Sequence, residues 1–575
     1  VALAREQGDR IPVRLVKGAY WDSEIKLCQQ QGFSGYPVYT RKEATDVAYL
    51  VCARFLMSDL ANKVIYPQFA THNAHTVASV LVMAERECTS DFEFQRLHGM
   101  GDALYNQVLE QYQKPVRIYA PVGSHKDLLP YLVRRLLENG ANSSFVHRLV
   151  DAKTAIAELV QHPVDLLKKN ANFYNEQILL PSEIYGKSRL NSQGINLDIE
   201  SEWEAFNEKV SVFMSQTWQQ GSWLNGKLIS VSEASEITCP YNRSDIVGHL
   251  SWADEVQVEK ALSHAVAGFE QWQTTAAEQR AECLERLAEL LEVHQEEFIA
   301  LCHREAGKTI HDAIDEVREA VDFCRYYANQ AREKFAEPLV MRGPTGESNE
   351  LRLSGRGVFL CISPWNFPLA IFLGQITAAL AAGNAVIAKP AEQTSLIAGR
   401  AIKLILDAGI PGAVIQCLPG DGGQLGERLV MDQRIAGVAF TGSTETARKI
   451  NQLLANRLGV IVPLIAETGG QNAMIVDSTA LPEQVVQDVI LSAFGSAGQR
   501  CSALRVLYIQ EDIANRVIDL LKGAMAELVI GNPSLHSTDI GPVIDERARQ
   551  GLQAHIDRMK AEAVLLAECE LSTDC

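Results

Sequence analysis

The sequence lacks several features that would place it in common classes of protein. Its twelve cysteines are scattered over 575 residues and form no Cys-x-x-Cys pair. This pattern argues against a disulfide framework or a structural zinc site and indicates a reduced, cytoplasmic chain without a bound metal. The 71 acidic residues outnumber the 53 basic ones, the formal net charge is −18, and no run of Lys and Arg stands out. Nucleic acid is therefore not an expected partner of this segment.

Long uninterrupted apolar runs are also absent. The most apolar window, residues 369–388, contains Gln375, Thr377 and Asn384. A buried helix followed by a buried strand therefore describes it better than a membrane span does. The sequence shows no repeat, low-complexity tract or signal peptide. It opens inside an expected helix and stops without an obvious finishing element, so we expect a fragment of a longer protein.

The first part of the chain alternates short apolar strands with amphipathic helices. Strands are predicted at residues 13–16, 64–70, 92–95 and 116–120. Four βα units in succession predict a parallel sheet. Polar and aromatic residues follow each strand, which is where a (β/α)₈ barrel keeps its chemistry. A charged, Asn-rich connecting segment follows, then long helices over residues 256–335, and a βαβ pattern begins after Gly357.

Three short segments rich in Gly or Pro carry groups suited to acyl chemistry. Cys501 supplies a thiol, Glu467 a carboxylate and Asn366 a primary amide. These are a nucleophile, a base and an oxyanion donor. A single cysteine near glycines is usually a small core residue, but three such segments in one chain favour catalysis. Partial burial of Glu467 would raise its pKa and suit it to activating water.

Strands predicted at residues 358–363, 385–388 and 437–440 each deliver a turn to the carboxyl edge of a parallel sheet, where nucleotides bind. The turn Gly442-Ser443-Thr444 opens a helix and could offer backbone amides to a phosphate, although most such turns are simply caps. Lys389 and Glu392 could bracket a ribose, or could form an ordinary solvated pair.

Five motifs occur in the order found in the NAD(P)-dependent aldehyde dehydrogenase superfamily, which this half of the chain resembles. They are Pro364-Trp365-Asn366-Phe367-Pro368, Lys389-Pro390-Ala391-Glu392, Phe440-Thr441-Gly442-Ser443-Thr444, Glu467-Thr468-Gly469-Gly470 and Gly498-Gln499-Arg500-Cys501. The resemblance implies a Rossmann-type α/β domain with Cys501 as nucleophile, Glu467 as base and Asn366 as oxyanion donor. It also implies NAD contacts at Ser363, Trp365, Lys389, Glu392, Thr441, Gly442 and Ser443. Ser502 is implied to contact the substrate.

Four motifs stand out in residues 1–150, namely Arg14–Trp21, Thr71-His72-Asn73, Gln95–Gly101 and Tyr131–Gly140. Through these motifs this part of the chain resembles the carboxyl-terminal half of the FAD-dependent proline dehydrogenase (β/α)₈ barrel. The resemblance implies FAD contacts at Arg14, Val16, Gly18, Trp21, Thr71, His72, Asn73, Gln95 and Glu138. It implies substrate contacts at Tyr20, Leu97, Tyr119, Tyr131, Arg134 and Arg135. An arginine pair can grip a substrate carboxylate, although it could equally be a solvated helix face.

A proline dehydrogenase-like barrel joined to an aldehyde dehydrogenase resembles the bifunctional proline utilization A family. The resemblance implies oxidation of L-proline to Δ1-pyrroline-5-carboxylate at FAD, then NAD-dependent oxidation of glutamate γ-semialdehyde to glutamate, with the intermediate passing between sites. It further implies a membrane quinone as electron acceptor, peripheral contact with the inner membrane, and a homodimer. The alternatives are a monofunctional aldehyde dehydrogenase with a scaffold barrel, or a proline-responsive regulatory protein.

The expected organisation has four parts. They are a partial FAD-binding barrel at 1–150, a connecting segment at 151–220, an NAD-binding domain at 221–466 and a truncated catalytic domain at 467–575.

Overall fold

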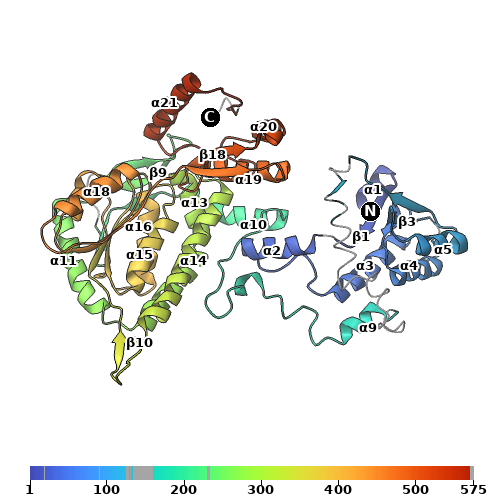
Figure 1. Cartoon of the computed structure of the whole chain (residues 1–575), viewed down its shortest axis with the longest axis horizontal. Helices are drawn as coiled ribbons and strands as arrows, with labels where there is room; N and C mark the ends of the chain where they lie inside the picture. Colours follow the sequence, from blue (N-terminus) through green and yellow to red (C-terminus); the bar gives the residue numbers. More distant parts are fainter. Residues whose placement is uncertain are drawn as a thin grey trace. The chain divides into compact units, whose positions relative to one another are not determined.

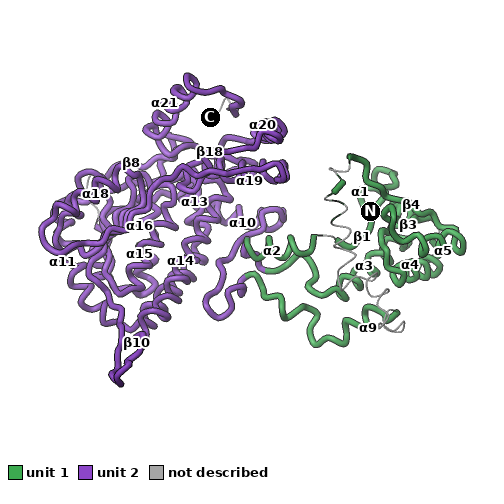
Figure 2. Tube along the Cα trace, viewed as in Figure 1, with its two compact units in different colours: residues 1–30, 35–181 green, residues 31–34, 182–575 purple. Residues whose placement is uncertain are grey.

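The computed structural model describes most of the chain in two compact units (Figure 2). The described residues are 1–18, 20–89, 91–124, 128, 129, 131, 133, 160–229, 234–569 and 571. The first unit comprises residues 1–30 and 35–181, and the second comprises residues 31–34 and 182–575.

The first unit is built on a sheet of four parallel strands, in the order β1-β2-β3-β4. The strands are β1 (Ile11–Val16), β2 (Ile65–Ala70), β3 (Glu93–Leu97) and β4 (Val116–Tyr119). The helices are α1 (Ala2–Gln7), α2 (Trp21–Gln31), α3 (Lys42–Met57), α4 (Ala74–Arg86), α5 (Asp102–Tyr112) and α9 (Pro163–Lys168). The predicted succession of βα units, and with it the half-barrel fold class, is confirmed.

Aromatic side chains fill the core between this sheet and its helices. Phe69 of β2 meets Phe92 edge-on with ring centroids 5.6 Å apart, and Phe92 meets Phe94 in the same way at 5.6 Å. All three are buried. Edge-to-face packing is favoured because the positive ring edge meets the negative ring face. The alternating burial of β2 is the pattern expected for a strand with one face on this core.

The second unit contains a sheet of seven strands in the order β16-β15-β12-β13-β14-β6-β7 (Figure 1). They are β6 (Ser222–Leu224), β7 (Lys227–Ile229), β12 (Val358–Ile362), β13 (Ala385–Lys389), β14 (Ile415–Cys417), β15 (Ile435–Thr441) and β16 (Leu464–Glu467). The strands from β16 to β14 are parallel, and β6 and β7 extend the sheet as an antiparallel hairpin. The predicted βαβ pattern after Gly357 and the Rossmann-type class are confirmed.

Helices surround this sheet and continue into the rest of the unit. They are α10 (Glu200–Ser211), α11 (Glu255–Trp272), α12 (Ala277–Val293), α13 (Gln295–Ala306), α14 (Ile310–Phe335), α15 (Ala370–Ala381), α16 (Ser395–Asp407), α17 (Gln424–Val430), α18 (Thr444–Asn456), α19 (Pro482–Phe494), α20 (Glu511–Ala526) and α21 (Glu546–Glu562), with 3₁₀ turns at η1 (Pro181–Glu183), η2 (Glu392–Thr394) and η3 (Gly495–Gly498). The remaining strands are β5 (Trp218–Gln220), β8 (Ser235–Thr238) and β9 (Ile246–Leu250) in one sheet, the hairpin β10 (Leu339–Met341) with β11 (Asn349–Leu351), and the parallel pair β17 (Asn472–Val476) with β18 (Leu504–Ile509).

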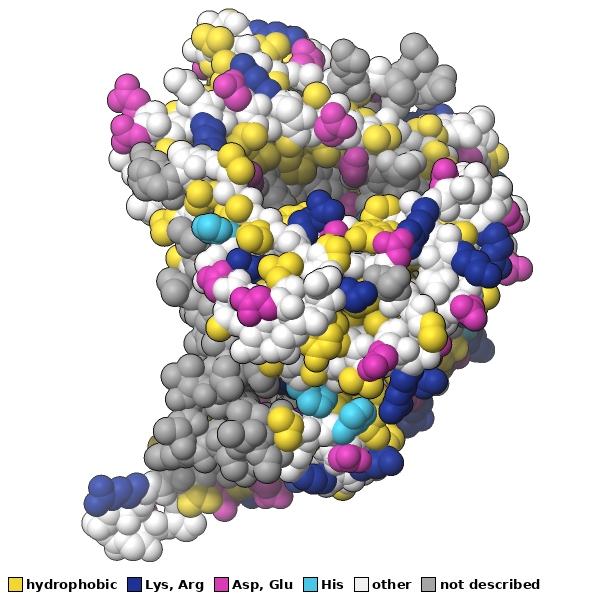
Figure 3. All heavy atoms as spheres, turned by 90° about the vertical axis from the view of Figure 1, so that its right-hand side faces the viewer, with side chains coloured by type: hydrophobic (Ala, Val, Ile, Leu, Met, Phe, Trp, Pro, Cys, Tyr) yellow, Lys and Arg dark blue, Asp and Glu magenta, His cyan; other side chains and the backbone are white. Residues whose placement is uncertain are grey.

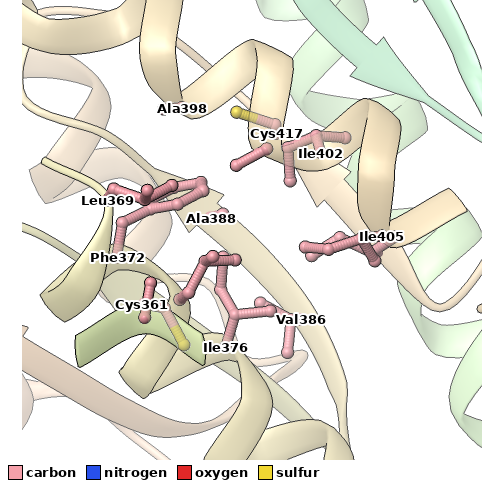
Figure 4. Close-up of a cluster of buried hydrophobic side chains, with 14 of the residues drawn as sticks. Cys361, Leu369, Phe372, Ile376, Val386, Ala388, Ala398, Ile402, Ile405 and Cys417 are labelled. Atoms are coloured by element: carbon pink, nitrogen blue, oxygen red, sulfur yellow. The ribbon is translucent and has the colours of Figure 1, made fainter. Parts of the chain in front are cut away.

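The main core lies between α15, α16 and the central strands (Figure 4). Phe372 and Ile376 of α15 gather with Val386 of β13 and Ile402 of α16, and all four are almost fully buried. The apolar window of residues 369–388 is therefore α15 followed by β13, as predicted. In the described part of the chain, none of the helices has the length and hydrophobicity needed to cross a bilayer.

The face of the molecule in Figure 3 carries acidic and basic side chains intermingled with apolar ones. Among the described side chains visible on this face, like charges do not gather into one continuous stripe. This distribution agrees with the absence of basic runs from the sequence.

Candidate active site

Four parallel strands bring the predicted site segments to one edge of the seven-stranded sheet. Ile362 at the end of β12 lies opposite Lys389 at the end of β13, and Thr441 at the end of β15 lies opposite Glu467 at the end of β16. The carboxyl ends of parallel strands meet at a common edge, where α/β folds bind ligands. Sheet pairing therefore gathers segments that are about 100 residues apart in sequence.

The Asn366 amide connects this edge to the cysteine segment. Its Nδ2 atom donates a hydrogen bond of 2.9 Å to the backbone oxygen of Gln499, two residues before Cys501. A primary amide carries two N–H groups on this nitrogen. One of them holds the Gln499 carbonyl, and among the described residues the second has no recorded acceptor.

Cys501 itself is exposed, and backbone contacts hold the loop that carries it. Asn472 Nδ2 donates to the carbonyl oxygens of Cys501, at 2.7 Å, and Ala503, at 3.0 Å. Ser496 and Ala497 have φ angles of 57° and 56°, in the left-handed region that non-glycine residues seldom occupy. Backbone strain of this kind concentrates at functional sites, where the surrounding contacts must maintain it.

The side chain of Gln499 ties the same loop to a distant part of the unit. Its Oε1 atom accepts from the backbone N–H of Ile544 at 3.0 Å, and its Nε2 atom donates to the Pro542 oxygen at 3.4 Å. The Asn366 amide thus holds the main chain of Gln499, and the contacts of its own amide hold the side chain. Gln499 lies two positions before the Cys501 thiol.

Glu467 lies at the end of β16 and is exposed. Its backbone oxygen accepts from Gly442 N at 3.1 Å. The expectation that this carboxylate is partly buried is wrong, because the end of β16 is open to solvent. Among the described residues, no hydrogen bond joins Glu467 to Cys501.

The Lys389–Glu392 pair lies at the carboxyl edge of the sheet, where β13 ends and η2 begins. Lys389 is only 3% exposed, and its Nζ atom lies 3.3 Å from Glu392 Oε1. The same oxygen accepts from Gly422 N at 2.6 Å. Because Lys389 is buried, the structure disfavours the alternative that Lys389 and Glu392 form an ordinary solvated pair.

The turn after β15 has the geometry of an anion cradle. Ser443 caps α18 by accepting from Thr446 N at 3.1 Å. A Cβ atom on Gly442 would lie 2.6 Å from the Phe440 ring, so the backbone here is open only because the residue is glycine. Thr441 Oγ1 accepts from Gln375 Nε2 at 2.9 Å. The free N–H groups at the start of this 13-residue helix suit a phosphate, so the residues fit a dinucleotide.

Two further residues expected at the cofactor flank this edge. Ser363, directly after β12, is buried, and its N–H donates to the Lys389 oxygen at 3.2 Å. Trp365 is half-buried in the segment that carries Asn366. Ser502 adjoins Cys501 and is exposed.

In the first unit, most of the described residues expected to contact FAD lie at or just beyond the carboxyl ends of β1 and β2, whereas Arg14 lies within β1 and Gln95 in the middle of β3. Arg14 lies over the ring of Tyr119 at 4.8 Å, and His72 Nε2 accepts from Leu97 N at 3.2 Å. Asn73 Oδ1 caps α4 by accepting from His75 N at 2.9 Å. The neighbouring Val16, Gly18 and Thr71 follow the same strand ends.

Gln95, in the middle of β3, carries a buried polar atom that a ligand beside this sheet could satisfy. The side chain is 4% exposed, and its Oε1 atom has no hydrogen-bond partner among the described residues, whereas Nε2 donates to Glu93 at 2.8 Å. A buried unpaired oxygen is costly unless a donor approaches it. A flavin ring offers such a donor.

The expected substrate residues of this unit are only partly described. Tyr20 and Tyr119 are exposed, and Leu97 and Tyr131 are half-buried. Trp21, which is expected to contact FAD, donates from Nε1 to the Tyr39 oxygen at 2.9 Å. Arg134, Arg135 and Glu138 lie outside the described residues.

The sequence pattern missed the residues that support the cysteine loop from α14. Arg500 forms an ion pair with Asp312, and Lys308 lies 3.2 Å from Glu316. Two carboxylates four residues apart at the start of a long helix are a visible signal, but their partners lie far away in the sequence.

Comparison with known proteins places both units in families. Residues 229–574 match the aldehyde dehydrogenase family, and residues 1–148 match proline dehydrogenase. Bifunctional protein PutA of Salmonella typhimurium is 50% identical over 98% of this chain and 42% of its own length. The chain thus spans less than half of that relative.

Solved structures agree with these matches. Proline utilization A from Bradyrhizobium japonicum is 51% identical with a TM-score of 0.88, over all of this chain and 55% of that one. A 1-pyrroline-5-carboxylate dehydrogenase from Thermus, solved with bound NAD, is 31% identical with a TM-score of 0.62, over 65% of this chain and 73% of that one. The chain belongs to the aldehyde dehydrogenase family and carries a proline dehydrogenase segment ahead of it, in the arrangement of the bifunctional proline utilization A proteins.

Proposed function

We propose that the second unit oxidises glutamate γ-semialdehyde to glutamate through a thioester on Cys501. The observation that carries this proposal is the hydrogen bond from Asn366 to the Gln499 oxygen. It brings the Asn366 amide, which has a second N–H group, against the backbone two residues before Cys501. The exposed position of Cys501 lets an aldehyde reach it.

The thiolate of Cys501 attacks the aldehyde carbon, and the second N–H of Asn366 stabilises the oxyanion that forms. Loss of hydride from the same carbon leaves a thioester on Cys501. Glu467 takes a proton from the water that hydrolyses the thioester, which releases the carboxylate product and restores the thiol.

NAD, when bound, supplies the hydride acceptor. We assign its binding to Ser363, Trp365, Lys389, Glu392, Thr441, Gly442 and Ser443, which lie at the carboxyl edge of the sheet or directly after it. Ser502 is assigned to the aldehyde substrate. Glu392 would accept from ribose hydroxyls, and the amides after Gly442 would meet a phosphate.

We propose that the first unit contributes to FAD-dependent oxidation of L-proline to Δ1-pyrroline-5-carboxylate, which hydrolyses to the semialdehyde. The buried and unpaired Oε1 atom of Gln95, in the middle of β3, supports a flavin beside this sheet. The flavin supplies the redox chemistry, and residues such as Arg14 and His72 would hold it. Together the two units would convert proline to glutamate. We divide the chain into 1–150, 151–220, 221–466 and 467–575 on this basis.

We further propose that a membrane quinone accepts the electrons from the flavin, and that the protein is a cytoplasmic homodimer in peripheral contact with the inner membrane. The domain order shared with the PutA proteins supports this assignment. Sedimentation with anionic vesicles in the presence of proline tests the membrane contact. Light scattering tests the homodimer.

The test of the main proposal is a coupled assay on the full-length protein with proline, a quinone and NAD, following glutamate. Cys501→Ala should abolish NADH formation from the semialdehyde and leave proline oxidation intact. Cys52→Ala, which removes another exposed thiol, is the matched control. Loss of both activities in Cys501→Ala would refute separate sites, and retained NADH formation would refute the thioester.

A further inference from the structure

Two buried carboxylates lie one turn apart at the start of α14. One contacts the segment after Asn366, and the other contacts the loop that carries Cys501. Asp312 is 8% exposed and Glu316 is 1% exposed. Neither belongs to the motifs that carry the nucleophile, base or oxyanion donor. A charged group this deeply buried requires compensating partners, and the partners show what each carboxylate holds.

Glu316 holds the segment that carries the oxyanion donor. Its Oε1 atom accepts from the backbone N–H groups of Leu369, at 2.9 Å, and Ala370, at 2.8 Å. Leu369 is the N-cap of α15, and Asn366 lies three residues before it. The first N–H groups of a helix have no partner within the helix and favour an anion. Glu316 therefore fixes the main chain immediately after Asn366.

Asp312 holds the nucleophile loop. It forms an ion pair with Arg500, the residue before Cys501. Thr309 Oγ1 donates to Asp312 Oδ2 at 3.0 Å and keeps the carboxylate in place. A planar guanidinium on a fixed carboxylate has little freedom to rotate. The position of Arg500, and through it the main chain at Cys501, is set from α14.

Lys308 contacts both the segment that carries Asn366 and the loop that carries Cys501. Its Nζ atom lies 3.2 Å from Glu316 Oε2, 4.8 Å from the centre of the Phe367 ring and 3.5 Å from Ser496 Oγ. Phe367 adjoins Asn366, and Ser496 is one of the two residues with a left-handed backbone in the cysteine loop. One buried ammonium thus contacts the oxyanion segment, the strained loop and α14.

We propose that Asp312 and Glu316 are positioning residues that set the Asn366 amide and the Cys501 thiol in the relative geometry needed for attack on the aldehyde. The proposal rests on the proposed function of Cys501. Both groups act through others: Glu316 through Asn366, and Asp312 through Arg500. Displacement of a reacting group by about 1 Å can cost about a hundredfold in rate, so loss of either carboxylate should show in turnover.

The test uses Glu316→Gln and Asp312→Asn in the full-length protein, with saturating NAD and the semialdehyde. Gln at 316 keeps an oxygen for the two α15 N–H groups but places an amide nitrogen against Lys308. Each variant should lose about tenfold to a hundredfold in kcat, with the KM for NAD and proline oxidation within twofold of wild type. Asp322 lies on the same helix and pairs with Arg189, and Asp322→Asn is the matched control, which should keep full turnover.

Alkylation of Cys501 by iodoacetamide distinguishes the role of Glu316 from that of Asp312, because this reaction forms no oxyanion and so does not need Asn366. Glu316→Gln should alkylate at the wild-type rate despite its low kcat, whereas Asp312→Asn should change both rates. Arg500→Met should lower kcat, and Arg500→Lys, which keeps a positive charge, should lower it less. Parallel falls of alkylation and kcat in Glu316→Gln would overturn the proposal, as would a large drop in melting temperature with unchanged kcat.

A double-mutant cycle gives the decisive comparison. If Glu316 acts through Asn366, adding Glu316→Gln to Asn366→Ala should lower kcat by less than twofold further. Multiplicative losses would overturn the positioning role. An active Cys501→Ala would instead refute the proposed function itself, so the two failures are distinguishable.

Discussion

The Asn366 side chain donates to the backbone oxygen of Gln499 over 2.9 Å, although 133 residues separate them in the sequence. This contact fastens the segment after β12 to the loop that leads into Cys501. It also leaves the amide with a second N–H directed elsewhere, which is the property that an oxyanion donor needs.

Asn366→Ala should lower kcat for aldehyde oxidation by about 10²–10³-fold, the usual cost of removing one oxyanion donor. Asn366→Asp should be as poor, since a carboxylate cannot donate. Stopped-flow measurement of NADH formation in the full-length protein tests this. Asn329→Ala, on the far part of α14, is the control, and a rate in Asn366→Ala within threefold of wild type would contradict the assignment.

Lys389→Met should lower kcat/KM for NAD by about 10-fold to 100-fold, because a hydrogen bond to a charged group contributes about 1.5–3 kcal/mol. The effect should appear in KM for NAD, while proline oxidation is unchanged. Lys403→Met removes an exposed lysine of α16 whose side chain is 48% accessible, and it serves as the control. Equal KM values in the two variants would remove Lys389 from the cofactor site.

Glu305 should make the second unit less stable as the pH rises. Its carboxyl accepts from Leu396 N at 2.7 Å and Ile397 N at 2.8 Å, and burial raises its pKa from 4.5 to about 8. Between these two values the folded state holds a proton that the unfolded state has lost, so stability falls with pH, by at most about 1.4 kcal/mol per pH unit.

Melting temperatures of the full-length protein between pH 5 and 8.5 measure this effect. Glu305→Gln cannot ionise, so its melting temperature should fall less over this range than that of wild type. Glu333→Gln, an exposed change, should keep the wild-type slope. Identical slopes in wild type and Glu305→Gln would show that Glu305 does not titrate in this window.

Arg117→Ala should loosen the sheet of the first unit at neutral pH. Arg117 Nε and Nη2 donate to the buried Glu93 carboxylate at 2.7 and 2.8 Å, and the guanidinium holds the pKa of Glu93 below its ordinary value. This stabilisation is present above the unfolded pKa and disappears as the pH falls through the folded pKa. Removing the partner should therefore lower the stability of this sheet at pH 7, and lower it less at pH 5.

Hydrogen exchange of the amides in β2, β3 and β4 reports this local stability. Protection should fall in Arg117→Ala at pH 7, and protonation of the unpaired Glu93 should restore part of it at pH 5. Arg54→Ala removes an exposed pair with Glu87 and is the control. Equal protection in both variants would show that the Glu93–Arg117 pair adds nothing to the sheet.

The sequence determined the class of fold and singled out the candidate reactive groups. The near-continuous apolar segments 358–362 and 385–389 favour strands of a parallel sheet, and in the structure they are mostly buried. Cys501, Glu467 and Asn366 stood out because their chemistry is unusual for Gly-rich and Pro-rich turns. Local pattern is sufficient for such features, since each depends on a few neighbouring residues.

Only the tertiary structure decided which groups support the site. Asp312, Glu316 and Lys308 look like an ordinary charged helix start in the sequence, and their meaning lies in Arg500 and the first amides of α15. The exposure of Glu467, contrary to expectation, depends likewise on what packs over the end of β16. Burial and partner choice arise from contacts between distant segments, and no local pattern of residues encodes them.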